Sequence, residues 1–148
     1  MTDDKSIEIK TVEAGSPLMA EILDLRAEVF VLEQGVPPEL ELDGLDEQAM
    51  HLAAIRDGAI VGTLRLLQDH GAAKIGRVAV RAALRQNGIG RRLMQRAETI
   101  ISDRGFRDIL LHAQITVAGF YRRLGYVEEG DRFDEAGIAH IAMRKRIV

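Results

Sequence analysis

The sequence predicts one α/β domain in which a mixed β-sheet is flanked by helices. Three observations lead to this class. Short apolar or alternating runs are interspersed with two amphipathic helical patterns. One glycine-rich loop joins an apolar strand to a helix, and 148 residues are enough for one buried core. No repeat or interdomain linker is visible, so residues 1–148 are expected to form a single domain.

A strand and a long helix are expected to open the chain. Residues 6–12 alternate as a strand, and Ser16-Pro17 is typical of a helix start. The helix that follows has one apolar face at spacings of three and four, formed by Leu18, Ile22, Leu25, Val29 and Leu32. The acidic run 39–47 then predicts a solvated loop or short helix, or alternatively a negative surface that attracts a cationic amine.

Five further strands and two helices are expected downstream. Residues 50–56 and 59–68 predict a hairpin around Asp57-Gly58, a strong turn dipeptide. A helix after the glycine-rich loop stops at Arg104-Gly105. The remaining strands are expected at residues 74–80, 108–113 and 138–143, with a short helix over residues 116–124.

The most informative segment is the loop of residues 85–92, Arg-Gln-Asn-Gly-Ile-Gly-Arg-Arg. Backbone N–H groups at a helix start, with no side chain at the two glycines, suit a pyrophosphate. A P-loop is excluded because Gly-Lys-Ser/Thr does not occur in the sequence. A dinucleotide fingerprint is excluded because Leu93 stands where a third glycine is required.

Charge and composition exclude several other functions. The net charge of −3 does not support a nucleic-acid-binding protein. No apolar run approaches the roughly 18–20 residues of a membrane span, and the acidic first residues do not resemble a signal peptide, so a cytoplasmic protein is expected. Without cysteine, and without two histidines at metal-ligand spacing, no metal site is expected.

Six arginines nevertheless gather around the glycine-rich loop, which gives the chain one local positive patch. Such a patch suits a polyanion of limited size better than a nucleic acid. The six are Arg77, Arg81, Arg85, Arg91, Arg92 and Arg96.

Two motifs resemble those of a known enzyme superfamily. Arg85-x-x-Gly88-x-Gly90 resembles the (Q/R)xxGx(G/A) signature of the GCN5-related N-acetyltransferases (GNAT). Residues 118–126, Ala-Gly-Phe-Tyr-Arg-Arg-Leu-Gly-Tyr, resemble the family's FYxxxGF/Y segment. Residues 26–34, 42–43, 113–114 and 134–140 are similar to the ElaA-like branch, so the resemblance runs from about residue 20 to the C-terminus.

The resemblance implies a GNAT-like acyl-CoA N-acyltransferase fold with acetyl-CoA as co-substrate. In that family the strand before the loop splays from its parallel neighbour, and the pantetheine arm fills the gap. This assigns the arm to Val78, Ala79 and Val80, and the pyrophosphate to Arg85, Gln86, Asn87, Gly88, Ile89, Gly90 and Arg91. Gln114 stands where many relatives carry a cofactor-binding asparagine.

The same resemblance makes Tyr121 the acid that protonates the leaving thiolate. A phenol with a reference pKa of about 10 can protonate a thiolate whose thiol has a pKa of about 8.5. The alternative is that Tyr121 is an ordinary core aromatic, but Phe120 is the better core candidate of the two.

The general base is left open by the sequence. A carboxylate or histidine on the acceptor side is required, and the candidates are Glu33, Asp43, His51, His112 and His140. The family forms part of its acceptor pocket at the end of the first helix, which makes Glu33 a candidate substrate residue. His140 is a second one, because it lies in a segment that matches the branch.

These features predict an N-acetyltransferase that moves an acetyl group from acetyl-CoA to a primary amine of a small molecule. Direct transfer in a ternary complex is expected, because no cysteine can carry the acetyl group. Two alternatives stay open, namely acetylation of a peptide N-terminus or lysine, and a non-catalytic acyl-CoA-binding module. An exposed terminal strand would also allow a homodimer.

Overall fold

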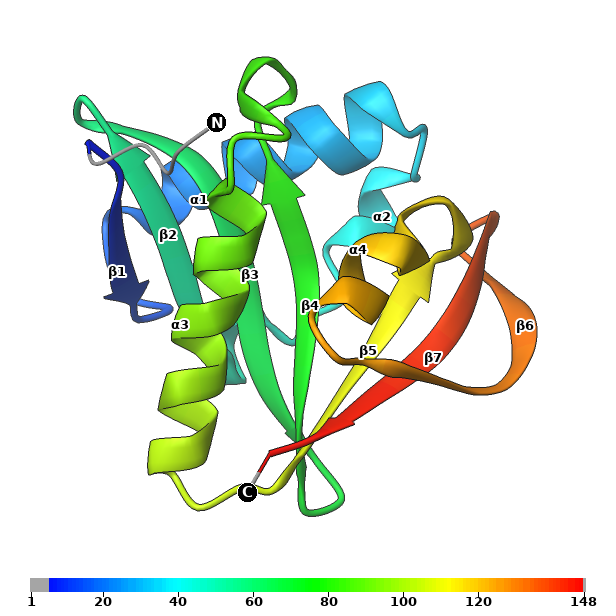
Figure 1. Ribbon diagram of the computed structural model, residues 1–148. Helices are drawn as coiled ribbons and strands as arrows, with labels where there is room; N and C mark the ends of the chain where they lie inside the picture. Colours follow the sequence, from blue (N-terminus) through cyan, green and yellow to red (C-terminus); the bar gives the residue numbers. More distant parts are fainter. Residues whose placement is uncertain (1–5, 148) are drawn as a thin grey trace.

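A seven-stranded mixed sheet forms the centre of the computed structural model, which describes residues 6–147 (Figure 1). The strand order is β1-β2-β3-β4-β5-β7-β6, and every neighbouring pair is antiparallel except β4 and β5. The strands are β1 (Glu8–Val12), β2 (Met50–Arg56), β3 (Ala59–Asp69), β4 (Ala72–Val80), β5 (Asp108–Gln114), β6 (Val127–Glu135) and β7 (Ile138–Arg146). The expected fold class is therefore confirmed.

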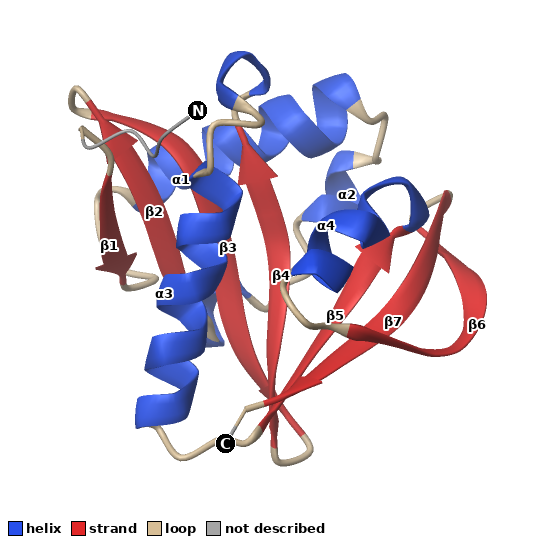
Figure 2. Ribbon diagram, in the orientation of Figure 1, coloured by secondary structure: helices blue, strands red, loops and turns tan. Residues whose placement is uncertain are grey.

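Helices cover both faces of the sheet (Figure 2). Helices α3 (Ile89–Asp103) and α4 (Ala118–Arg123) lie on one face, and α1 (Met19–Arg26) and α2 (Pro38–Glu41) lie on the other. A π-helical segment, η1 (Ala27–Glu33), continues α1. Short 3₁₀ turns are η2 (Asp46–Gln48), η3 (Ala82–Leu84) and η4 (Ile115–Val117). Within residues 6–147, no helix is long and apolar enough to cross a membrane.

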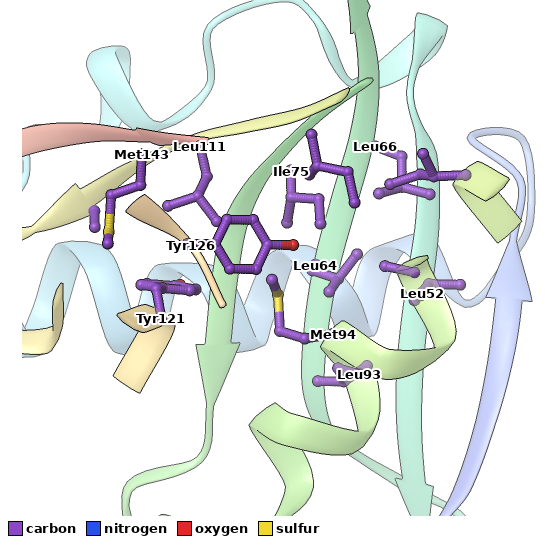
Figure 3. Close-up of a cluster of buried hydrophobic side chains, with 14 of the residues drawn as sticks. Leu52, Leu64, Leu66, Ile75, Leu93, Met94, Leu111, Tyr121, Tyr126 and Met143 are labelled. Carbon is purple, nitrogen blue, oxygen red and sulfur yellow. The ribbon is translucent and has the colours of Figure 1, made fainter. Parts of the chain in front are cut away.

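The core consists of two apolar layers, one under each set of helices. The larger layer packs α3, through Leu93 and Met94, against Leu52 and Leu64 of the sheet, all 0–1% exposed (Figure 3). The smaller layer packs α1 and η1 against β2 and β3. Every strand either contributes side chains to one of these layers or is hydrogen-bonded to a strand that does. The sheet is therefore a rigid platform for the residues at its strand ends.

Two sequence expectations are wrong. Leu32 was expected on the apolar face of the first helix but is 80% exposed. It lies in η1, where i→i+5 hydrogen bonding changes the angular spacing, so a residue three positions after Val29 turns away from the core. Strand β6 was not expected, because its residues are mostly exposed and show no apolar alternation. It is an edge strand that pairs with β7 alone.

Gly62 of β3 lets α3 lie close to the sheet. A β-carbon at this position would be 3.0 Å from Ile89 Cγ2 and 3.0 Å from Leu93 Cδ1. Because Ile89 is the first residue of α3, the missing side chain at Gly62 also sets the position of the glycine-rich loop.

We predict that Gly62→Ala lowers the free energy of unfolding by about 1–3 kcal/mol, because the added methyl group overpacks this contact. Urea unfolding monitored by circular dichroism measures the change. Gly76→Ala in β4 is the matched control, because the nearest atom to its β-carbon is Arg65 Nε at 4.0 Å. Equal effects of the two substitutions would contradict the close packing of α3 on Gly62.

Candidate active site

The two parallel strands of the sheet separate soon after they meet. Only two residue pairs, Ala73 with Ile109 and Lys74 with Leu110, join β4 to β5, although both strands continue well beyond them. The β3–β4 register also shifts, and Arg77 in β4 has a φ of +52°, which marks a β-bulge. Strands β4 and β5 therefore diverge toward their C-terminal ends, as Figure 1 shows.

A cavity of about 1090 Å³ occupies the gap between the diverging strands. On one face its walls come from the glycine-rich loop, the start of α3 and helix α4. On the other face they come from η1, α2 and the turn between β6 and β7. Because both faces contribute walls to a single cavity, two reactants bound on opposite sides of the sheet can meet inside it.

The glycine-rich loop forms one end of the cavity. Gln86 and Gly88 have positive φ angles of +66° and +83°, and Gly88 is the N-cap of α3. The helical bonding starts with Arg92 N–H, which donates to the Gly88 carbonyl at 3.0 Å, so the earlier amides have no intrahelical acceptor. Most predicted loop residues line the cavity, namely Arg85, Gln86, Gly88, Ile89, Gly90 and Arg91.

Two loop residues have structural contacts that the sequence did not reveal. The Asn87 side-chain amide donates to the carbonyls of Leu84 and Arg85, at 3.1 and 3.3 Å, and Asn87 does not line the cavity. At Gly90 a β-carbon would be 3.3 Å from the Phe120 ring. The second glycine therefore also allows α4 to pack against the loop.

An ion pair joins the loop to the end of η1. The Arg85 guanidinium donates two hydrogen bonds to the Glu33 carboxylate, at 2.5 and 2.7 Å, and one to the Val80 carbonyl at 2.9 Å. The bond from Arg85 lowers the pKa of Glu33. Glu33 was considered for acceptor binding, but it lies outside the cavity lining and its carboxylate is already paired. The geometry does not favour that role.

Tyr121 combines burial with access to the cavity. It is 7% exposed, packs edge-to-face on Phe120 with ring centroids 5.0 Å apart, and lines the cavity. Burial raises the pKa of its hydroxyl. Phe120, expected to be the core aromatic, is only half-buried, whereas Tyr121 belongs to the core (Figure 3). No hydrogen-bond partner of the Tyr121 hydroxyl is found among residues 6–147.

The second tyrosine of this region, Tyr126, is a structural residue. Its hydroxyl donates to Glu98 Oε2 at 2.8 Å, and Lys145 Nζ donates to Glu98 Oε1 at 2.9 Å. Burial raises the pKa of Tyr126, and Glu98 raises it further. Because Tyr126 does not line the cavity, only Tyr121 presents a phenol to the site.

Arginines bind three of the carboxylates in the acidic run after the first helix. Arg26, which is 1% exposed, donates to Glu41 at 2.6 Å and to Asp46 at 2.7 Å. Arg65, which is 4% exposed, donates to Asp43 at 2.5 Å and to Asp46 at 3.1 Å. The expected short helix is confirmed as α2, whereas the expected free negative surface is wrong, because arginines distant in sequence neutralise Glu41, Asp43 and Asp46.

A third arginine attaches the same segment to the bulge of β4. The Arg77 guanidinium donates to Asp43 Oδ2 at 3.2 Å and to the Glu41 carbonyl at 3.0 Å. The bulge residue of β4, Arg77 with its positive φ angle, therefore also bonds the segment that forms one wall of the cavity. The ion-pair network, comprising Arg26, Glu41, Asp43, Asp46, Arg65 and Arg77, places α2 against the sheet.

Two candidate bases have unsuitable surroundings. The hydrogen bond from Arg65 holds the pKa of Asp43 well below its usual range, so this carboxylate is a weak proton acceptor. His51 is 0% exposed, does not line the cavity, and donates from Nε2 to the Asp46 carbonyl at 3.0 Å. Burial lowers its pKa. His51 therefore supports the network and does not face the acceptor.

The other two histidines lie at the far end of the cavity, with one carboxylate between them. His112 Nδ1 is 2.9 Å from Glu135 Oε1, and His140 Nε2 is 3.7 Å from Glu135 Oε2. The Phe133 ring contacts both imidazoles, edge-on to His112 at 5.0 Å and stacked on His140 at 6.0 Å. His112, Glu135 and His140 all line the cavity.

Gln114 connects the two walls of the acceptor end. Its side-chain amide donates to Gln34 Oε1 at 2.8 Å, which links β5 to the residue after η1. The sequence did not identify four further cavity residues that carry charge, Arg65, Lys74, Arg123 and Glu135. Glu135 closes β6, whose exposed pattern gave no strand signal, and the other three lack a local pattern that distinguishes them from surface charges.

Comparison with known proteins agrees with this geometry. The sequence profile of the acetyltransferase (GNAT) domain matches residues 14–147. The Bacillus subtilis protein named uncharacterized N-acetyltransferase YjcF is 35% identical over 122 residues, which are 82% of this chain and 87% of that protein. An acyl-CoA N-acyltransferase from Pseudomonas aeruginosa has a similar crystal structure, with a TM-score of 0.85, 36% identity, and coverage of 95% of this chain and 99% of the other.

The chain therefore belongs to the GNAT acetyltransferase family, and it is an N-acetyltransferase. Within that family its structure is similar to Escherichia coli ElaA, with a TM-score of 0.84, 27% identity, and coverage of 94% of this chain and 99% of ElaA. The resemblance drawn from the two motifs and the four shorter segments is confirmed.

We predict that Asp43→Asn lowers the free energy of unfolding at pH 7 by about 1–3 kcal/mol, because it removes charge-assisted hydrogen bonds from Arg65 and Arg77. The pKa of Asp43 is lower in the folded state than the reference value of about 3.9. Its contribution is therefore complete above pH of about 4 and is lost as the pH falls further.

The difference between wild type and Asp43→Asn should shrink accordingly in urea titrations below pH of about 4. Asp57→Asn is the matched control, since Asp57 is 87% exposed in the β2–β3 turn. A pH-independent difference between wild type and Asp43→Asn would show that the carboxylate charge does not stabilise the fold.

Proposed function

We propose that this enzyme transfers the acetyl group of acetyl-CoA directly to the primary amine of a small molecule, within a ternary complex. The observation that carries the proposal is the cavity between β4 and β5. It has a helix N-terminus at one end, imidazole and carboxylate groups at the other, and walls on both faces of the sheet. Two substrates can therefore occupy it together, and no cysteine is present to carry the acetyl group.

The loop end is proposed to bind the pyrophosphate of acetyl-CoA. The amides at the start of α3 have no intrahelical acceptor, and the helix dipole favours an anion there. Arg91 and Arg123 also line the cavity and add positive charge. These groups fit a diphosphate, because charge-assisted hydrogen bonds to phosphate oxygens are among the stronger polar contacts in proteins.

The splayed part of β4 is proposed to bind the pantetheine arm through its main chain. Val78, Ala79 and Val80 line the cavity where β4 no longer pairs with β5. An unpaired strand edge offers N–H and C=O groups to an extended amide-containing ligand. The same N–H groups can stabilise the oxyanion that develops on the acetyl carbonyl. Gln114, the last residue of β5, lines the same cavity.

Tyr121 is proposed to donate a hydrogen bond to the leaving sulfur. Because burial raises its pKa, the phenol keeps its proton at neutral pH. The full proton transfer expected from the sequence is unfavourable, because a thiol with a reference pKa of about 8.5 is a stronger acid than the phenol. The hydroxyl stabilises the developing thiolate, and the nitrogen of the collapsing intermediate supplies the proton that ends on sulfur.

A small acceptor is favoured by the walls at the imidazole end. Phe30, Val36 and Leu40 come from one side, and Ala136 and Ile138 come from the β6–β7 turn. Apolar side chains of this kind would pack against a small acceptor bound at this end. The ion-pair network also means that the acidic run does not select a polycationic amine.

The direct test is calorimetric titration of acetyl-CoA, followed by a thiol-release assay. The assay panel contains aromatic amines, aliphatic amines, amino-acid amides and short peptides. Acetyl-CoA binding together with turnover of a small amine is the expected result. Turnover of peptides alone would contradict the small-molecule acceptor, and absence of acetyl-CoA binding would contradict the assignment of the loop.

We predict that Gly88→Val reduces acetyl-CoA binding below detection while the protein stays folded. A β-branched side chain is strained at a φ of +83° and would displace the amides at the start of α3. Calorimetry measures binding, and circular dichroism checks folding. Gly71→Val is the matched control, because Gly71 has a φ of +85° in the distant β3–β4 turn. Wild-type affinity in Gly88→Val would reject the loop assignment.

We also predict that Tyr121→Phe leaves the affinity for acetyl-CoA within about twofold and lowers kcat by about 10²-fold or more, as removal of a transition-state hydrogen-bond donor does. Steady-state kinetics with an amine from the panel measures kcat. Tyr126→Phe is the control, because it removes a hydroxyl bonded to Glu98 outside the cavity. An unchanged kcat in Tyr121→Phe would remove this phenol from the mechanism.

A further inference from the structure

The imidazole end of the cavity brings together side chains from three neighbouring strands. His112 lies in β5, Glu135 ends β6, and His140 lies in β7. In β5, Leu111 and Ala113 point into the core layer under α3 and α4. Because strand side chains alternate, His112 points to the opposite face, where η1 and α2 form the walls of the acceptor end.

The contact with Glu135 determines which nitrogen of His112 carries the proton in the neutral ring. The hydrogen bond from His112 lowers the pKa of Glu135, so the carboxylate is ionised and can only accept. Nδ1 must then carry the hydrogen, and Nε2 keeps its lone pair. The edge contact with Phe133 restricts the ring further.

The Nε2 atom of His112 is free to meet a substrate. The side chain is 32% exposed and lines the cavity, and no group in residues 6–147 bonds to this nitrogen. His140 differs in both respects. Its side chain is 8% exposed, and its Nδ1 donates to the Ile138 carbonyl at 2.7 Å, which holds the ring beneath Phe133. His140 therefore supports Glu135 and the turn, whereas His112 faces the cavity.

We infer that His112 is the general base that takes a proton from the acceptor ammonium, and that Glu135 is the residue that positions it. The inference rests on the proposed function. His112 Nε2 accepts one ammonium proton, so the N–H bond breaks and the nitrogen lone pair can form a bond to the acetyl carbonyl carbon.

The later steps balance without another reagent. The C–S bond breaks as the tetrahedral intermediate collapses, and the second proton lost by nitrogen ends on sulfur. His112 leaves the reaction as an imidazolium beside the Glu135 carboxylate and returns its proton to water. The products are the amide, free CoA thiol and one proton.

Three ionisable groups on the neighbouring strands belong to the surroundings of His112. Glu135 lies beside Nδ1, His140 lies across the same carboxylate, and Lys74 of β4 acts on Glu135 through its charge. A variant at His112 must therefore be compared with one at Glu135, because either change alters the charge of the whole group.

The first experiment measures kcat/KM against pH for wild type, His112→Gln and Glu135→Gln, with the most active amine of the panel. We expect His112→Gln to lose about 10²-fold or more at neutral pH and to lose the acidic limb of the profile, with acetyl-CoA affinity unchanged. Glu135→Gln should show a smaller loss and should shift that limb. A wild-type profile in His112→Gln would overturn the inference.

His70→Asn is the matched control. His70 is 98% exposed in the β3–β4 turn and has a φ of +48°, which asparagine tolerates. It removes one histidine without touching the cavity, so its pH profile should match that of wild type. A loss of the acidic limb in His70→Asn would overturn the assignment of that limb to His112.

The second experiment does not depend on turnover. Nitrogen-15 NMR of the imidazoles should show neutral His112 protonated at Nδ1 in wild type, with that preference weakened in Glu135→Gln. A neutral ring protonated at Nε2 would overturn the inference even if the enzyme is active. If wild type binds acetyl-CoA but acetylates none of the panel, the proposed function fails; an active His112→Gln variant would reject only the base.

Discussion

The site depends on the early end of backbone pairing between β4 and β5. Two residue pairs hold the strands together at their N-terminal ends, and beyond them the sheet opens. Without that separation α3 and α4 would be isolated from η1 and α2 by a continuous sheet. With it, residues on the two faces line one cavity. The bulge at Arg77 contributes to this opening, because the extra residue bends β4 away from its regular course.

Ion pairs keep the opened region in place. Arg77 and Arg26 bond Glu41 at the end of α2, and Arg65 bonds Asp43 in the segment that follows. Removing one member of a buried ion pair leaves an uncompensated charge, which is costly, so the network strongly restricts this wall. The arginines of the network neutralise the charge of its carboxylates. The acceptor end is therefore governed by the local groups at His112 and Glu135 instead of by a general negative field.

Much of the fold could be predicted because its signals are local. The apolar run at residues 74–80, the glycines at 88 and 90, and the amphipathic pattern of α3 are visible in short windows, and all three elements are confirmed. Strand β6 could not be found, because an exposed edge strand needs no apolar alternation. The exposed position of Leu32 results from the change from α-helix to π-helix at η1, which helix propensities do not reveal.

The candidate site was partly predictable for a related reason. Loop residues and Tyr121 lie in contiguous motifs, and the structure places most of them around the cavity. The partners of the acidic run could not be inferred, because Arg65 and Asp43 are separated by 22 positions and only the folded sheet brings them together. The contact between His112 and Glu135 could not be inferred for the same reason, because these residues are separated by 23 positions.

The Arg85–Glu33 ion pair has a thermodynamic consequence for the two halves of the molecule. Arg85 belongs to the loop before α3, and Glu33 ends η1 on the opposite face of the sheet. Any anion that competes for Arg85 must weaken the bonds from Arg85 to Glu33, which are among those that hold the end of η1. Coupling between sites is reciprocal. A change that stabilises the Glu33–Arg85 ion pair must therefore weaken the binding of that anion by the same coupling free energy.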